Sequence, residues 1–213
     1  MIVCIGDSHS SVFSEEEKIV GVWPKKEYKV LSRFKPIRIG PSTAYNLFKK
    51  VNLLDDVLNK TLYFSKDYAL FCFGEVDIRA HLIKQSKLQN KDVGLLTKEC
   101  VVRYVEAIKL VKPKRKIQKA IFGPIASWSL DKPYDGPSYG TNLERNFVTK
   151  VFNQELEILC EENDIKFISI FESLLNKDGT TNSIYLDDMG AGIHLNQKAM
   201  PLIIKEMKLK SLL

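Results

Sequence analysis

The chain begins with an apolar run that ends in a serine and a histidine. Ile2 to Ile5 carry no polar residue, and Gly6-Asp7-Ser8-His9 follows directly. Such a run is typical of a strand buried on both faces of a parallel sheet, and ligands of these sheets bind at the carboxyl ends of the strands. Ser8 is therefore a candidate nucleophile. Asp7 and Ser8 are also residue types that favour turns and helix caps, which is the alternative interpretation of the same residues.

The chain has three histidines that could act as the base for such a serine: His9, His81 and His194. A serine hydroxyl becomes a good nucleophile when a base removes its proton, and histidine is the common base because its pKa lies near neutrality. His194 is the candidate, because the glycines of Gly190-Ala-Gly-Ile-His would let the backbone bring its ring towards the first strand.

Acyl transfer also needs donors aimed at the oxygen that becomes negative. Gly40 lies where a predicted strand ends, and its lack of a side chain would let a substrate approach the backbone. The backbone N–H groups of Ser8 and Gly40 are therefore the two candidate donors.

Length and composition indicate one globular domain over residues 1–213. The chain has 45% hydrophobic and 27% charged residues and a net charge of +6, which is ordinary for a soluble protein. The one dense basic run, residues 112–116, has no aromatic residues between its charges, so we expect a solvated connection and no nucleic-acid partner. Mild basicity would suit an anionic sugar or glycan. The sequence does not indicate an oligomeric state.

Four cysteines are spaced widely, without a C-x-x-C pair, and lie in apolar stretches. This pattern predicts reduced core thiols and neither disulfides nor a zinc site. We expect no metal and no cofactor. The first predicted strand leaves no room for a signal peptide, and no apolar stretch approaches the length of a membrane span, so we expect a cytoplasmic protein.

Apolar runs alternate with segments of helical periodicity along the whole chain. We expect strands at 2–5, 18–23, 35–39, 68–73, 117–122 and 165–170, and helices at 41–58, 97–111, 142–163 and 194–210. Strands that alternate with helices predict a parallel sheet with helices on both faces.

A second polar cluster, residues 74–81, follows the strongest predicted strand. Taken in order, Gly6-Asp7-Ser8, Gly40, Gly74-Glu-Val-Asp77 and Gly192-Ile-His194 resemble the motifs of the SGNH, or GDSL, hydrolase superfamily over nearly the whole chain. The resemblance implies a flavodoxin-like, three-layer α/β/α sandwich with a central parallel sheet of about five strands. It also implies an esterase, lipase, carbohydrate deacetylase or acyltransferase. Ser8 would be the nucleophile, His194 the base and Gly40 an oxyanion donor.

The third motif departs from the superfamily pattern. The pattern has an asparagine, itself an oxyanion donor, where this chain has Val76. A cationic donor suits an oxyanion, so Arg79 or His81 could replace it, and we assign the role to Arg79.

The last motif departs as well. The superfamily places an aspartate three residues before the histidine, where this chain has Ala191. Asp187 and Asp188 lie close upstream, and we assign Asp188 as the acid. The alternative is a Ser–His dyad with a backbone carbonyl orienting the ring.

Five further residues are assigned to substrate binding or support, with Glu75 expected to hold the loops together through the neighbouring arginine: Asp7, His9, Glu75, Asp77 and His81. The whole set predicts a serine-dependent ester hydrolase or O-acyltransferase acting on acetyl or other small acyl esters of a sugar or glycan. The alternative, motivated by the two departures, is a catalytically degenerate carbohydrate-binding module on the same fold.

Overall fold

The computed structural model describes residues 1–25, 33–62, 64, 67–131, 137–187 and 192–213. The centre is a five-stranded parallel sheet with the order β2-β1-β3-β4-β5. The strands are β1 (Ile2–Gly6), β2 (Phe34–Arg38), β3 (Tyr68–Cys72), β4 (Gln118–Phe122) and β5 (Lys166–Ile168). This is the flavodoxin-like order, and it confirms the predicted α/β class.

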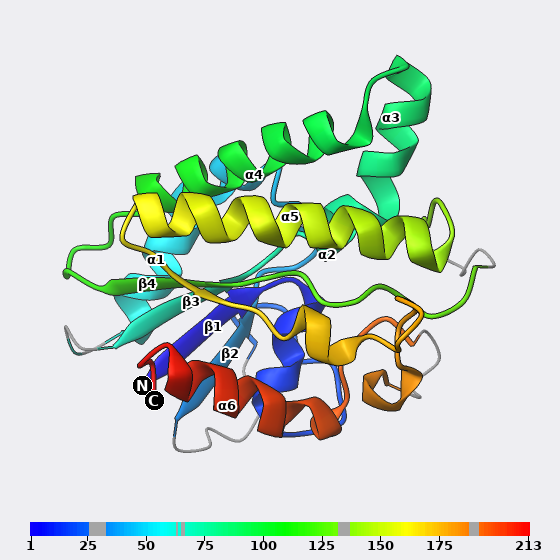
Figure 1. Ribbon diagram of the computed structural model, residues 1–213. Helices are drawn as coiled ribbons and strands as arrows, with labels where there is room; N and C mark the ends of the chain where they lie inside the picture. Colours follow the sequence, from blue (N-terminus) through cyan, green and yellow to red (C-terminus); the bar gives the residue numbers. More distant parts are fainter. Residues whose placement is uncertain (26–32, 63, 65–66, 132–136, 188–191) are drawn as a thin grey trace.

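Helices cover both faces of this sheet, which makes three layers (Figure 1). One face is covered by α1 (Val51–Thr61), α4 (Val93–Leu110) and α5 (Asn142–Glu162), and the other by α6 (Met200–Leu209) and the 3₁₀-helix η1 (Ser8–Ser14). The remaining helical segments are η2 (Leu47–Lys50), α2 (Glu75–Asp77), the π-helix η3 (Ile78–Leu82), α3 (Ile83–Gln89), η4 (Phe171–Leu174), η5 (Ser183–Tyr185) and η6 (Gln197–Ala199).

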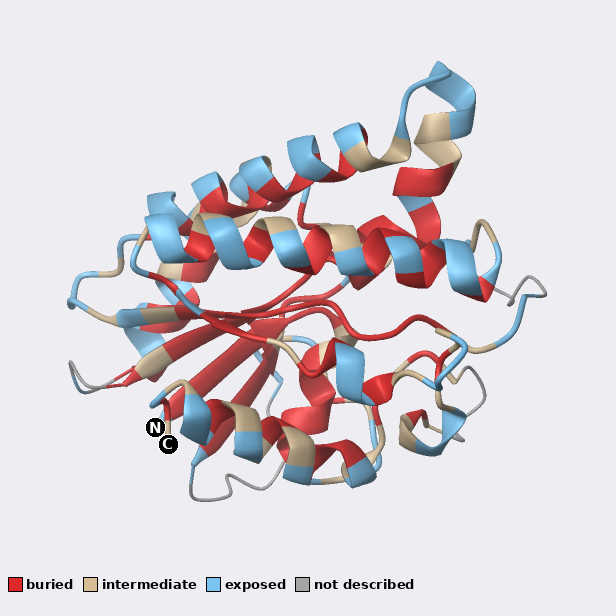
Figure 2. Ribbon diagram, viewed as in Figure 1, coloured by how far each residue is buried: buried red, intermediate tan, exposed pale blue. Residues whose placement is uncertain are grey.

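The strands contribute to two separate cores, because successive side chains of a strand point to opposite faces. Val3 and Ile5 pack with buried residues of α1, α4 and α5, whereas Ile2 and Cys4 pack with those of η1 and α6. Figure 2 shows the strands buried between the two helical layers. The absence of polar alternation in β1 thus reflects burial on both faces.

All four cysteines are buried and free, as their apolar surroundings predicted. None of the helices in the described part of the chain combines the length and the hydropathy needed to cross a bilayer.

Two predicted elements near the second strand differ in the structure. Residues 18–23 form no strand, and only Val22 makes an isolated bridge, to Arg38. The helix expected from residue 41 begins at η2, because the carboxylate of Asp77 accepts the N–H groups of Ala44 and Tyr45 and holds that segment in a turn.

Two predicted helix starts also move. Helix α4 begins at Val93 and not at Thr97, because Asp92 caps it by accepting the N–H of Leu95 at 2.8 Å. The last helical segment begins at η6 and not at His194. The structure therefore places His194 in a loop ahead of that helix.

Candidate active site

Three site segments start from the same edge of the sheet. Gly6, the last residue of β1, pairs with the last residues of β2 and β3. Ser8, Gly40 and Gly74 each lie two residues beyond these paired positions. The N–H of Ile39 also donates to the carbonyl of Gly6 at 2.9 Å, which keeps the segment after β2 beside the start of η1.

The turn that carries Ser8 needs a glycine before it. A Cβ at Gly6 would lie 2.5 Å from the carbonyl oxygen of Cys72, so a larger residue would push β1 away from β3. Asp7 then caps η1, since its Oδ1 accepts the N–H of His9 at 2.9 Å. The capping interpretation of Asp7 is therefore correct, and Ser8 is the first residue of the helix.

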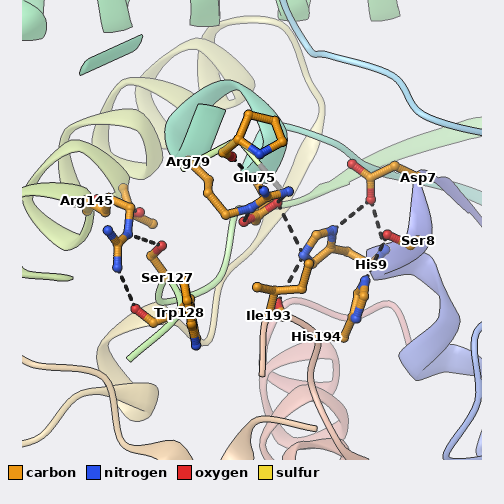
Figure 3. Close-up of polar contacts among 12 residues, drawn as sticks. Asp7, Ser8, His9, Glu75, Arg79, Ser127, Trp128, Arg145, Ile193 and His194 are labelled. Carbon is orange, nitrogen blue, oxygen red and sulfur yellow. Dashed lines mark hydrogen bonds and ion pairs between the residues drawn. The ribbon is translucent and has the colours of Figure 1, made fainter. Parts of the chain in front are cut away.

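Ser8, His194 and Asp187 form a chain of hydrogen bonds. His194 Nε2 lies 2.9 Å from Ser8 Oγ, and His194 Nδ1 lies 3.1 Å from Asp187 Oδ2. An ionised carboxylate only accepts hydrogen bonds, so Nδ1 carries the proton and donates a hydrogen bond to Asp187. In the neutral ring Nε2 then accepts from the Ser8 hydroxyl, as a general base must. Figure 3 shows the side chains of Ser8 and His194, which come from opposite ends of the chain, facing each other.

Asp187 reaches His194 through a short antiparallel pairing. Leu186 bridges Leu195, and the N–H of Asp187 donates to the carbonyl of His194 at 2.8 Å. Gly192, at φ +60°, takes the left-handed conformation within the connection between these segments. The pairing places a residue seven positions before the histidine beside its ring.

The acid assigned from the sequence was Asp188, which lies outside the described residues. Among the described residues, the carboxylate that contacts the ring of His194 is that of Asp187, the other of the two residues considered. The register of this pairing brings Asp187 to the ring, and spacing alone does not reveal that register.

His9 lies between carboxylates next to His194 (Figure 3). Its Nδ1 lies 2.9 Å from Asp7 Oδ1, and its Nε2 lies 3.1 Å from the carbonyl oxygen of Ile193 and 3.4 Å from Glu75 Oε2. The centroids of the His9 and His194 rings are 4.8 Å apart. Only 10% of the His9 side chain is exposed, so these contacts dominate its environment.

The two neighbouring histidines have opposite charge preferences. Burial would lower the pKa of His9, but the carboxylates of Glu75 and Asp7 outweigh burial and raise it to about 9. Burial and the nearby His9 cation lower the pKa of His194 to about 4, against the opposing effect of Asp187. At neutral pH the first ring is charged and the second is free to accept a proton.

Arg79 forms an ion pair with Glu75, as expected from the sequence. Its Nε lies 2.6 Å from Glu75 Oε1, and its Nη1 donates to the carbonyl of Pro137 at 2.9 Å. These contacts tie the segment after β3 to the loop after β4. The guanidinium of Arg79 therefore holds these two segments together, and its assignment as an oxyanion donor stays a prediction.

Asp77 and His81 lie away from this cluster. The carboxylate of Asp77 accepts the N–H of Ala44 at 2.6 Å and that of Tyr45 at 3.1 Å, and so holds the segment that follows Gly40. Burial raises the pKa of Asp77 to about 7, against the effect of these hydrogen bonds. His81 is exposed and lines a separate cavity of about 390 Å³.

A buried polar group missed in the sequence holds the loop after β4. Arg145 of α5 donates to Ser127 Oγ and to the carbonyl of Trp128, both at 2.9 Å (Figure 3). It also donates to the carbonyl of Leu130 at 2.7 Å. The signal was an arginine on the apolar stripe of a helix, three and seven positions before Val148 and Phe152. No group of three His, Cys, Asp or Glu side chains suited to a metal ion occurs within the described ranges.

Neither a family model nor a curated protein matches the chain. Solved structures do match it over nearly its whole length. One is a putative acylhydrolase from Bacteroides fragilis, at 15% identity and a TM-score of 0.59, covering 100% of this chain and 88% of that one.

Two other solved structures are similar to this chain. A member of the lipolytic G-D-S-L family from Veillonella parvula has 15% identity and a TM-score of 0.53, with 98% of this chain and 96% of that one covered. A carbohydrate acetylesterase from Sinorhizobium meliloti has 13% identity and a TM-score of 0.52, with 100% and 99% covered. At these identities the likeness concerns the fold alone, which this chain shares with these solved structures.

Proposed function

We propose, on the premise that this chain has a divergent SGNH/GDSL hydrolase fold, that it is a serine-dependent ester hydrolase or O-acyltransferase. Its substrate is an acetyl or other small acyl ester of a sugar or glycan. The observation that carries the proposal is the hydrogen-bonded chain from Ser8 through His194 to Asp187.

The proposed reaction runs through an acyl-serine. Ser8 Oγ attacks the ester carbonyl carbon while His194 Nε2 takes the hydroxyl proton and Asp187 keeps the ring oriented. The tetrahedral intermediate collapses, and His194 returns the proton to the departing alcohol oxygen. Water or an acceptor hydroxyl then attacks the acyl-serine with the same base. Hydrolysis and transfer share these steps, so both remain in the proposal.

The proposed oxyanion hole uses the backbone N–H groups of Ser8 and Gly40. Val76 offers no side-chain donor, and the guanidinium of Arg79 is bound to Glu75 and Pro137. Loss of one oxyanion donor costs about 10²–10³ in rate. We therefore expect a slow enzyme, unless Arg79 exchanges one of these contacts for the substrate oxygen.

The proposed place for the sugar part of the ester is the cavity of about 390 Å³. Its lining comes from the segments that follow β2 and β3, the two strands flanking β1, and from Leu96, Glu99 and Cys100 of α4, whereas Ser8 and His194 do not line it. Its side chains include the uncharged groups of Tyr45, Asn46, Gln85 and Gln89, which suit hydroxyl groups. Two solved structures of similar fold are those of a carbohydrate acetylesterase and an acetyl xylan esterase.

The decisive experiment is intact-mass spectrometry after incubation with a fluorophosphonate, alongside turnover of p-nitrophenyl acetate. We expect one adduct on the wild type that maps to Ser8 and is absent from Ser8→Ala. Exposed Ser173, in η4, provides the matched control, since Ser173→Ala should retain adduct and turnover.

The second candidate function is a carbohydrate-binding module with a degenerate catalytic site. Val76 favours this candidate, because valine provides no side-chain donor for an oxyanion hole. This candidate predicts glycan binding without a covalent adduct on Ser8. Absence of both adduct and turnover, in wild-type protein that circular dichroism shows to be folded, would overturn the enzyme proposal in its favour.

A further inference from the structure

Both ring nitrogens of His9 face oxygen atoms. Nδ1 faces a carboxylate oxygen of Asp7, and Nε2 faces the carbonyl oxygen of Ile193 and a carboxylate oxygen of Glu75. Carbonyl and ionised carboxylate oxygens accept hydrogen bonds and donate none. Both nitrogens must therefore carry protons for the contacts to be hydrogen bonds, which makes His9 an imidazolium cation.

We propose that His9 is a positioning residue whose imidazolium holds the Ile193 carbonyl, and with it His194, against the end of β1 and keeps the His194 ring in its neutral, proton-accepting form. The role rests on the proposed function, because it acts through His194 and not on the substrate.

The first part of the role is a tether. Ile193 immediately precedes His194, and its carbonyl is 3.1 Å from His9 Nε2. His9 is itself fixed by Asp7, since the same carboxylate oxygen accepts both its backbone N–H and its Nδ1–H at 2.9 Å. The tether therefore links the loop of the base to the turn of the nucleophile, which are distant in sequence.

The second part is electrostatic. The two rings are 4.8 Å apart and both are mostly buried, so the charge on one disfavours charge on the other. Glu75, itself paired with Arg79, supplies a carboxylate that keeps the charge on His9.

The charged and titratable groups around the two rings come from four segments. They are Asp7 and His9 at η1, Glu75 and Arg79 after β3, Asp187 and His194 in the C-terminal loop, and Glu16, Glu17 and Lys18, which line a small cavity with His194. Glu16 pairs with Lys18, and Glu17 accepts the N–H of Gln197. Of these groups, His9 is the cation whose charge lowers the pKa of His194.

The test is a pH titration of the three imidazoles by NMR, which needs no substrate. In the wild type we expect His9 to lose its proton near pH 9 and His194 to stay neutral down to about pH 4. His9→Gln keeps a donor for the Ile193 carbonyl but lacks the charge. In this variant we expect the midpoint of the His194 titration to lie at least about one pH unit higher than in the wild type. His81→Gln assigns the third signal and should not move the His194 midpoint.

Enzyme kinetics provide the second readout. With p-nitrophenyl acetate, the acid limb of kcat/KM should move to higher pH in His9→Gln by the same interval as the NMR midpoint. At pH 8, where His194 is neutral in either protein, His9→Ala should lose more activity than His9→Gln, because only the glutamine can still donate to Ile193. A merely structural role would lower activity at every pH alike.

An unchanged His194 midpoint in His9→Gln would overturn the proposal, as would a wild-type His9 that loses its proton at or below pH 6.5. Should His9→Gln not fold, Glu75→Gln tests the charge on His9 itself, because loss of this carboxylate should lower the His9 midpoint, and an unchanged His9 midpoint would overturn the proposal. Failure of the proposed function would appear as a missing Ser8 adduct with the titrations intact, so the two failures are distinguishable.

Discussion

The orientation of the His194 ring depends on one carboxylate, and the sequence offers two neighbouring candidates, Asp187 and Asp188. In the structure Asp187 contacts His194 twice. Its Oδ2 lies 3.1 Å from Nδ1 of the ring, and its Oδ1 lies 3.4 Å from the backbone nitrogen. Two contacts from one carboxylate fix both the position and the tautomer of the ring. A change at this carboxylate should therefore affect chemistry more than folding.

Asp187→Asn is expected to lower kcat by up to about 10⁴, because an amide that donates to Nδ1 favours the tautomer with its proton on Nε2, where it cannot accept from serine. The measurement is kcat for p-nitrophenyl acetate, together with the thermal midpoint to show that the fold is retained.

Asp188→Asn is the matched comparison at the adjacent position. A loss of kcat confined to Asp187→Asn would assign Asp187 as the acid, in agreement with its contact with His194. A loss confined to Asp188→Asn would restore the original assignment from the sequence, and no loss in either variant would favour a Ser–His dyad.

At the scale of elements, the site depends on a pairing between the segments 184–187 and 194–196. Asn196 holds both segments together. Its side chain donates to the carbonyls of Ile184 and Leu186 at 2.9 and 2.8 Å, and it also caps η6 by accepting the N–H of Lys198. Because this pairing positions Asp187 beside His194, its loss should misalign the base.

Asn196→Ala is expected to lower kcat by between about tenfold and hundredfold, as small misplacements of catalytic groups do, and to lower the free energy of unfolding by about 1 kcal/mol. Asp92→Ala removes the cap of α4 and serves as the control, since it should cost similar stability without the loss of kcat. Equal activity losses in the two variants would show that Asn196 acts through stability alone.

At the scale of the whole molecule, the two histidines make the stability depend on pH in opposite directions. The pKa of His9 in the folded state, about 9, lies above its ordinary value of 6.5, so its contribution is full below pH 6.5 and is lost as the pH rises through 9. The pKa of His194 is lowered to about 4, so its contribution is full above pH 6.5 and is lost as the pH falls towards 4.

The difference in unfolding free energy between the wild type and His9→Gln should therefore shrink by about 3 kcal/mol between pH 6.5 and 9. Urea unfolding at a series of pH values measures it. A difference that stays constant over that interval would mean that His9 is not held as a cation in the folded protein.

The sequence by itself determined the local order of the fold. Uninterrupted apolar runs such as Tyr68 to Phe73 predicted strands buried on both faces, and their alternation with helices predicted a parallel sheet, because these signals depend only on neighbouring residues. The same reasoning placed Ser8 and Gly40 at the carboxyl ends of strands. It failed at residues 18–23 and 41–46, where contacts with distant residues decide the conformation.

Only the tertiary structure decided which side chains meet. Asp187 contacts His194 because of the register of an irregular pairing, and no local signal specifies that register. His9 is charged because Glu75, from another strand end, lies beside it. Protonation states and hydrogen-bond partners depend on groups far apart in the chain, so they follow from the packing of the whole molecule.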